Sequence, residues 1–153
     1  MARSSSSSLL AAAAVLAGAA ACGDPAAPEF PEDYARSFVE VRACRPSGDH
    51  DLRSVRVLVD PSGLSSYLTR DAPHPEGAVV LKEEYEFGDR ACAGPVAEWT
   101  VMRRRATAEH GGWRWQRVDA DRQVVSEDDS RCIGCHAACG QAPDGHDGTC
   151  AVP

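Results

Sequence analysis

Several features that mark common classes of protein are scarce or missing in this sequence. Its one extended apolar run, from Leu9 to Ala21, is too short to span a bilayer as a mature helix. Basic residues number 16 against 23 acidic ones, and no basic stripe is present, which argues against a nucleic-acid partner. No segment repeats, so the 153 residues predict one compact domain.

The N-terminal 21 residues are typical of a signal peptide, because Arg3 and a serine run precede the apolar stretch. The segment from Leu16 to Cys22 resembles a bacterial lipoprotein cleavage box, in which Cys22 carries the lipid. Ordinary secretion with cleavage near Ala21 is the alternative. Residues 22–31 predict a tether, and the folded domain is expected to span residues 32–153. We expect an exported protein that is periplasmic or attached to a bacterial membrane only through its lipid.

Alternating apolar residues predict four strands in this domain. They cover residues 53–59, 77–86, 97–105 and 113–119. The last two are expected to form a hairpin around the turn at residues 109–112.

Three helices are expected beside these strands. Residues 31–43 combine a proline in the first turn with apolar residues at helical spacing. A short helix through Tyr67 is expected after the strand at residues 53–59. The acidic residues 127–130 suit the start of a third helix, which carries the segment CIGCH at residues 132–136.

The CIGCH segment supplies what covalent attachment of haem requires. Cys132 and Cys135 are two thiols that can bond the vinyl groups, and His136 directly follows as an iron ligand. The alternatives are a redox dithiol or half of a zinc site. There is no second CxxC, and the C-terminal cysteines and histidine lack a regular metal-ligand pattern. We therefore predict one haem c per chain.

The remaining cysteines suggest disulfides. Seven cysteines are present, and four are left after Cys22, Cys132 and Cys135 are assigned. In an oxidising compartment they form two disulfides, for which three connectivities are open. We favour pairing Cys44 with Cys92 and Cys139 with Cys150.

No sixth iron ligand stands out. Met102 lies in an expected strand, where a methionine belongs to the core more often than to a metal. Four histidines lie in polar, turn-like stretches and are interpreted as surface residues: His50, His74, His110 and His146. An iron without a sixth protein ligand admits small molecules.

Lys82 is the only lysine in the chain. On an extended strand it shares a face with Ala78, Val80 and Glu84. Its amine either lies at the edge of a buried pocket or reaches solvent along the strand, and the spacing alone favours solvent.

The sequence resembles the cytochrome P-460 family across nearly the whole domain. The resemblance rests on RVLVDPSGLSSY at residues 56–67, PEGAVVLKEEYE at 75–86, WTVMRRR at 99–105, GGWRWQRVDADRQV at 111–124, and CIGCH. It implies an α+β fold, mainly an antiparallel β-sheet with flanking helices and a C-terminal haem-binding CxxCH helix. It also implies a five-coordinate haem c beneath a ligand pocket, often in a homodimer.

The resemblance also implies roles for two residues. In cytochrome P-460 proper a lysine is bonded to the haem, and Lys82 matches it. A distal carboxylate accepts protons there, and Glu98 is the nearest candidate, although gaps could place Ala97 or Trp99 at that position. The ending departs from the family pattern, because two cysteines replace an aromatic-containing segment and a disulfide could replace its packing. The tryptophans are expected in the core, and contact between them and the haem is a second possibility.

Three functions follow from the resemblance and the motif. The leading one is oxidation of hydroxylamine, with electrons passed to a partner cytochrome. The second is binding or sensing of nitric oxide without turnover, as in cytochrome c′-beta. The third is electron transfer by a six-coordinate haem, with Met102 as the ligand.

Overall fold

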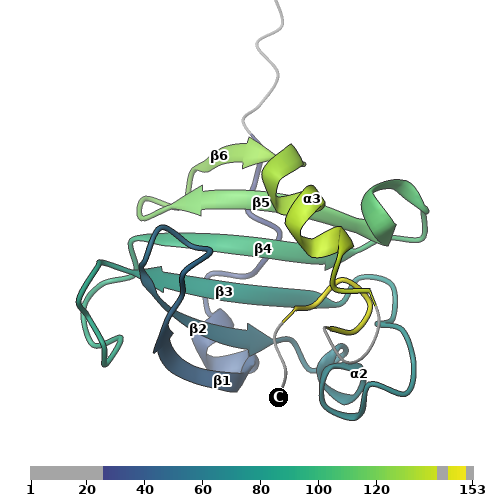
Figure 1. Ribbon diagram of the computed structural model, residues 1–153, viewed down its shortest axis with the longest axis horizontal. Helices are drawn as coiled ribbons and strands as arrows, with labels where there is room; N and C mark the ends of the chain where they lie inside the picture. The colour runs from purple at the N-terminus through teal and green to yellow at the C-terminus, as the bar shows by residue number, and fades with distance from the viewer. Residues whose placement is uncertain (1–25, 141–144, 151–153) are drawn as a thin grey trace, which may run out of the picture.

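One antiparallel sheet of six strands forms the body of the protein, and each strand pairs with the next along the chain (Figure 1). The computed structural model describes residues 26–140 and 145–150. The strands are β1 (Val39–Pro46), β2 (Ser54–Val59), β3 (Val79–Tyr85), β4 (Glu98–Arg104), β5 (Trp113–Asp119) and β6 (Val124–Glu127). The helical elements of these residues are α1 (Tyr34–Ser37), α2 (Leu64–Thr69), the 3₁₀ turn η1 (Glu109–Gly112) and α3 (Ser130–Ala137). None of the helices described is long and apolar enough to cross a membrane.

The mainly antiparallel α+β class predicted from the sequence is confirmed. The four expected strands are β2 to β5, and β4 and β5 pair along their whole length as the predicted hairpin. The short helix through Tyr67 is α2. The third expected helix is α3, which carries residues 132–136 and is capped where Asp129 accepts a hydrogen bond of 2.8 Å from the backbone N–H of Arg131.

The helix predicted over residues 31–43 is wrong beyond its first turn. Helix α1 ends at Ser37, and β1 begins at Val39 and pairs with β2. Val39 and Val41 are β-branched residues that fit a strand, and the ladder with β2 outweighs the helical spacing of the apolar residues. The edge strand β6 was not predicted either, because its four residues are too few for a clear alternation.

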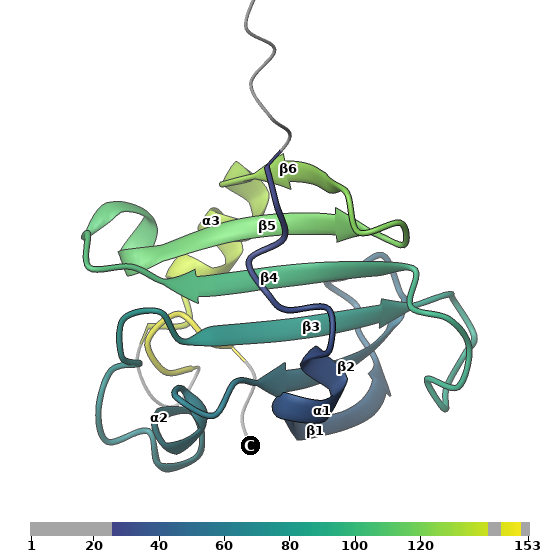
Figure 2. The same ribbon diagram turned by 180° about the vertical axis from the view of Figure 1, so that it is seen from behind.

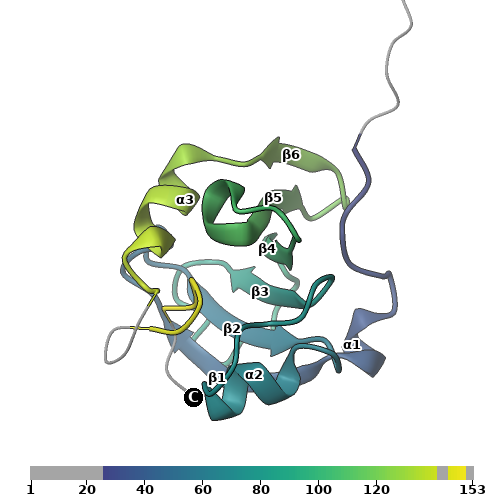
Figure 3. The same cartoon turned by 90° about the vertical axis from the view of Figure 1, so that its right-hand side faces the viewer.

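The two faces of the sheet have different coverings. On one face Val79 and Leu81 of β3 pack against Phe30 and Tyr34, and the N-terminal segment and α1 cross this side (Figure 2). We call this the core face. The opposite face carries Val80, Lys82 and Glu84 of β3, and helix α3 and the C-terminal segment lie over it (Figure 3). We call it the cavity face.

A buried carboxylate organises the core face. Glu83 is 1% exposed and accepts hydrogen bonds of 2.7 Å from the hydroxyls of both Tyr34 and Tyr85. Arg56 donates to the same carboxylate over 2.6 Å. Burial, and next the bond to Glu83, raises the pKa of Tyr34 to about 12. Glu83 thus joins α1 to the sheet through fully hydrogen-bonded polar groups.

The four cysteines that remain after Cys22 and the two of the haem motif are assigned lie in the favoured pairs. Cys44 of β1 and Cys92 of the β3–β4 connection are at disulfide-bonding distance, and so are Cys139 and Cys150. Cys132 and Cys135 are the free cysteines of the described residues. Cys22 lies outside the described residues.

Removing the Glu83 carboxylate should destabilise the protein. We expect Glu83→Ala to lower the free energy of unfolding by about 3 kcal/mol. This value is at the low end for breaking a buried ion pair, because Arg56 keeps some access to water. Glu86 is exposed just beyond β3, and Glu86→Ala should change stability by less than about 0.5 kcal/mol. Urea denaturation at neutral pH measures both. Equal effects of the two variants would contradict a structural role for Glu83.

Candidate functional site

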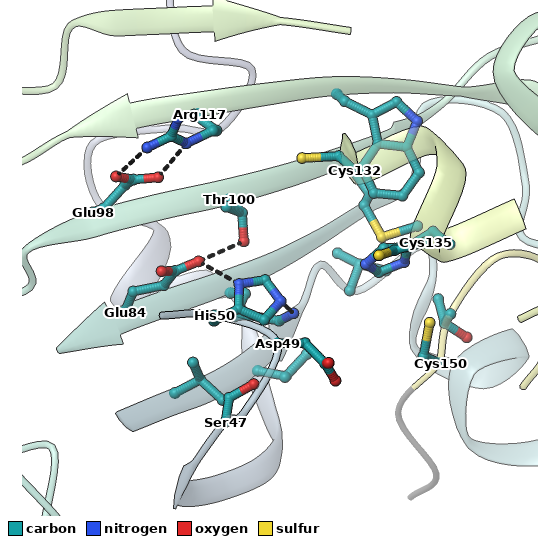
Figure 4. A pocket seen from close by; sticks show the side chains of 18 of the residues that line it. Ser47, Asp49, His50, Glu84, Glu98, Thr100, Arg117, Cys132, Cys135 and Cys150 are labelled. Atoms are coloured by element: carbon teal, nitrogen blue, oxygen red, sulfur yellow. Dashed lines mark hydrogen bonds and ion pairs between the residues drawn. The ribbon is translucent and has the colours of Figure 1, made fainter. Parts of the chain in front are cut away.

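A cavity of about 630 Å³ opens on the cavity face of the sheet. This volume lies in the range of protein sites for small molecules and cofactors. Its walls come from β1 to β5, from residues 47–51 of the β1–β2 loop, from α2 and α3, and from C-terminal residues that include Cys139 and Cys150 (Figure 4). The apolar part of the wall includes Val57, Val80, Met102 and Trp115. The alternation of each strand puts these side chains on one side of the sheet.

Helix α3 brings the CxxCH residues to this cavity. Cys132, Cys135 and His136 all line it. The two cysteines are three positions apart, so they lie on neighbouring turns of one helical face. His136 follows directly, and its ring contacts the ring of Trp115 at a centroid distance of 4.6 Å. Two thiols and an imidazole thus reach one cavity from a single short helix.

The ring of His136 is held in one tautomer. Its Nδ1 lies 2.8 Å from the backbone oxygen of Gly148. A carbonyl oxygen only accepts, so Nδ1 carries the proton and donates, and Nε2 of the neutral ring keeps its lone pair. Burial is the main reason that the pKa of His136 is lowered to about 4. The residue is therefore a neutral imidazole, the form that binds metal ions.

A polar row crosses the cavity wall beside the thiols. The Nζ atom of Lys82 lies 2.5 Å from Nε2 of His50, and Nδ1 of His50 lies 2.8 Å from a carboxylate oxygen of Glu84. The Nδ1–H of His50 donates a hydrogen bond to the Glu84 carboxylate, so Nε2 of the same ring accepts one from the Lys82 amine. Thr100 donates to the same Glu84 oxygen over 3.3 Å. Burial above all lowers the pKa of Lys82 to about 8.

Glu98 lies next to Glu84 on the neighbouring strand and also lines the cavity. Arg117 binds it through two bonds of 2.6 and 2.9 Å, one to each carboxylate oxygen. Arg53 adds a contact of 3.4 Å. Figure 4 shows the bonds of Glu98 to Arg117 and those of Glu84 to His50 and Thr100, and Arg53 also lies 3.6 Å from Glu84. Glu98 is thus held in a bidentate ion pair with Arg117, whereas the shortest bonds of Glu84 go to His50 and Thr100.

The structure brings most of the predicted site residues together. Lys82, Glu98, Cys132, Cys135 and His136 line the same cavity. Of the two positions open for the Lys82 amine, the structure therefore shows the one at the cavity and not the one in solvent.

Two histidines differ from the expectation of a surface position. The side chain of His50 is 20% exposed and forms part of the cavity wall, and that of His74 is completely buried beside Asp147. Both environments are made by residues that are distant in the chain. The sequence around each histidine therefore does not predict its burial. Glu84 was also missed as a cavity carboxylate, although its position two residues after Lys82 on the same strand face was a usable signal.

The residues present fit a haem. Trp115 Nε1 and the Tyr67 hydroxyl are buried without a hydrogen-bond partner among the described residues, and both belong to residues that line the cavity. The apolar wall, the free thiols and the available Nε2 of His136 match the needs of a covalently attached ring with an iron at its centre. Among residues 26–140 and 145–150, no group of three His, Cys, Asp or Glu side chains could hold a metal ion by itself.

A β domain whose cavity is reached by a CxxCH helix defines the class of the protein, which is that of the haem-binding cytochromes. A family model described as Cytochrome P460 matches residues 31–144. The chain therefore belongs to the cytochrome P460 family, which implies a haem cofactor and confirms the resemblance seen in the sequence. No curated protein matched the sequence.

The single lysine allows a direct test of the environment of the cavity wall. In a Cys132→Ser/Cys135→Ser variant, which cannot attach haem through thioethers, the reactivity of the Lys82 amine should reach half its maximum near pH 8 instead of 10.5. Burial disfavours the ammonium form, so the proton leaves at lower pH. Reductive methylation followed by peptide mass spectrometry measures the titration, with a free lysine derivative as the reference. A midpoint above pH 10 would mean that the amine is solvated.

Proposed function

We propose that this chain is an exported haem c oxidoreductase that oxidises hydroxylamine and passes the electrons to a partner cytochrome. Cys132 and Cys135 would bond the haem, one per chain, and His136 would bind its iron. The observation that carries the proposal is the meeting of the CxxCH residues with the Lys82–His50–Glu84 row in one cavity. Export through the N-terminal segment, lipid attachment at Cys22 and self-association into a homodimer are part of the proposal and rest on the sequence and the resemblance.

Each group of side chains has a defined task in this function. When bound, the haem supplies an iron that exchanges electrons and accepts a small nitrogen ligand. His136 would bind the iron through Nε2, because its Nδ1 proton is donated to the carbonyl oxygen of Gly148. Val57, Val80 and Met102 exclude water from part of the wall, which strengthens the electrostatic effect of the neighbouring polar groups.

Oxidation of hydroxylamine releases protons together with electrons, so the site needs a proton acceptor. Glu98 was the acceptor expected from the sequence, and Glu84 is the better candidate by its contacts. Arg117 binds both oxygens of Glu98 at short distance, whereas Glu84 is bonded to His50 of the β1–β2 loop and has a longer contact of 3.6 Å with Arg53. A histidine in this position can pass protons from the carboxylate towards solvent.

The same cavity would serve the second candidate function, which is binding of nitric oxide without turnover. The third, a six-coordinate electron carrier with Met102 as ligand, is disfavoured because Met102 is 6% exposed and packs in a buried apolar cluster with Val80 and Trp115, as a core methionine does.

Paired carboxamide variants distinguish the two carboxylates. Glu84→Gln should lower kcat/KM for hydroxylamine by about 10²-fold, the lower range for loss of a general base. Glu98→Gln keeps that base and should cost less than about tenfold. Rates are measured with an artificial electron acceptor at equal haem content. The reverse order would assign the base to Glu98, and tight nitric oxide binding with no turnover in the wild-type protein would favour the second function.

Lys82 should be bonded to the haem if the chain follows cytochrome P-460 proper. Proteolysis of the purified holoprotein should then release the segment around Lys82 joined to the haem peptide of Cys132 and Cys135, which mass spectrometry identifies. Lys82→Arg should abolish the link and leave the two thioether bonds. Recovery of Lys82 in a free peptide would remove the cross-link from the proposal and leave the haem attachment intact.

A further inference from the structure

The C-terminal segment at residues 145–150 contains the atom that accepts the hydrogen bond of the His136 ring. The acceptor is the backbone oxygen of Gly148, 2.8 Å from Nδ1. No side chain has this role, so the direction of the bond depends on how the segment is fixed. Hydrogen bonds to the second nitrogen of a metal-bound imidazole make the ligand more electron-rich.

The conformation of Gly148 leaves its carbonyl little freedom. Its φ is +84°, and a β-carbon at this position would lie 3.0 Å from Nε1 of Trp113. A side chain would therefore be strained by the backbone and crowded by the indole. The N–H of Gly148 donates to the oxygen of Cys139 over 3.3 Å, which ties the same residue to the chain just after α3.

Asp147 anchors the segment to the body of the protein. Its backbone oxygen accepts a bond of 2.7 Å from Trp113 Nε1. Its carboxylate accepts from the backbone N–H of His74 over 2.8 Å and lies 3.3 Å from the guanidinium of Arg104. These partners belong to β4, β5 and the α2–β3 connection, so three parts of the chain hold the residue that precedes Gly148.

A covalent restraint adds to these bonds. Cys150 lies at disulfide-bonding distance from Cys139, two residues beyond the end of α3. The pair ties the segment to the helix that carries His136, and both partners of the Nδ1 bond are therefore fixed relative to each other. The pair lies in the ending where the sequence departs from the pattern of the family.

We propose that the Cys139–Cys150 disulfide and Asp147 are positioning elements that hold the Gly148 carbonyl against His136 and thereby set the donor strength of the iron ligand. The inference rests on the proposed haem at His136. Opening the disulfide loosens the Gly148 acceptor, makes the imidazole a weaker electron donor, and shifts the iron towards the ferrous state.

The test compares two double variants in the holoprotein. Cys139→Ser/Cys150→Ser should lower the Fe–His stretching frequency of the ferrous haem in resonance Raman spectra. It should also reduce the ferric-to-ferrous ratio at a fixed ambient potential, because a less electron-rich imidazole stabilises ferric iron less. Cys44→Ser/Cys92→Ser removes the other pair, whose residues do not line the cavity, and should leave both quantities unchanged.

Asp147→Asn is the second variant, because it keeps both cysteines and the backbone of Gly148. It should shift both quantities in the same direction by a smaller amount. Unchanged spectra and ratio in Cys139→Ser/Cys150→Ser and in Asp147→Asn, or equal shifts in the Cys44→Ser/Cys92→Ser control, would overturn the inference. A pyridine haemochrome assay of the wild-type protein separates this result from failure of the proposed function, because a protein without haem c fails there first.

Discussion

The alternation of side chains along β3 is the constraint on which the rest of the structure depends. Val79, Leu81 and Glu83 face the core, and the residues between them face the cavity. A shift of one residue in the pairing with β2 or β4 would exchange these faces and move Lys82 into the core. The apolar core on one face therefore also fixes the register that presents Lys82 and Glu84 to the site.

The carboxylates of Glu83 and Glu84, adjacent on β3, have different roles because they lie on opposite faces of the sheet. Glu83 is bonded to two tyrosines and an arginine and ties α1 to the sheet. Glu84, the next residue, is bonded to His50 and Thr100 at the edge of the cavity. The hydrogen-bond partners of Glu83 are tyrosines and an arginine, which keep one protonation state over the physiological range. Glu84 instead contacts an imidazole, a group that can exchange protons.

Local patterns in the sequence predict the central strands, the hairpin and α3, because alternation and capping act over a few residues. They fail for β1, where pairing with β2 decides the conformation of residues with helical spacing. The thiols and His136 form a contiguous motif and are found easily. His50 is different, because a loop from elsewhere in the chain brings it to Lys82, and the acceptor in Gly148 is a backbone atom that leaves no residue-type signal.

The order of the strands has a consequence for how the protein folds. All pairs in the sheet join neighbours in the chain, so the walls of the cavity can form by successive closure of short connections. Helix α3 follows the last strand and packs on a surface whose strands precede it in the chain. We therefore expect α3 to dock last during folding. Its two thiols would then stay accessible to an enzyme that attaches haem, while the sheet beneath them has already formed.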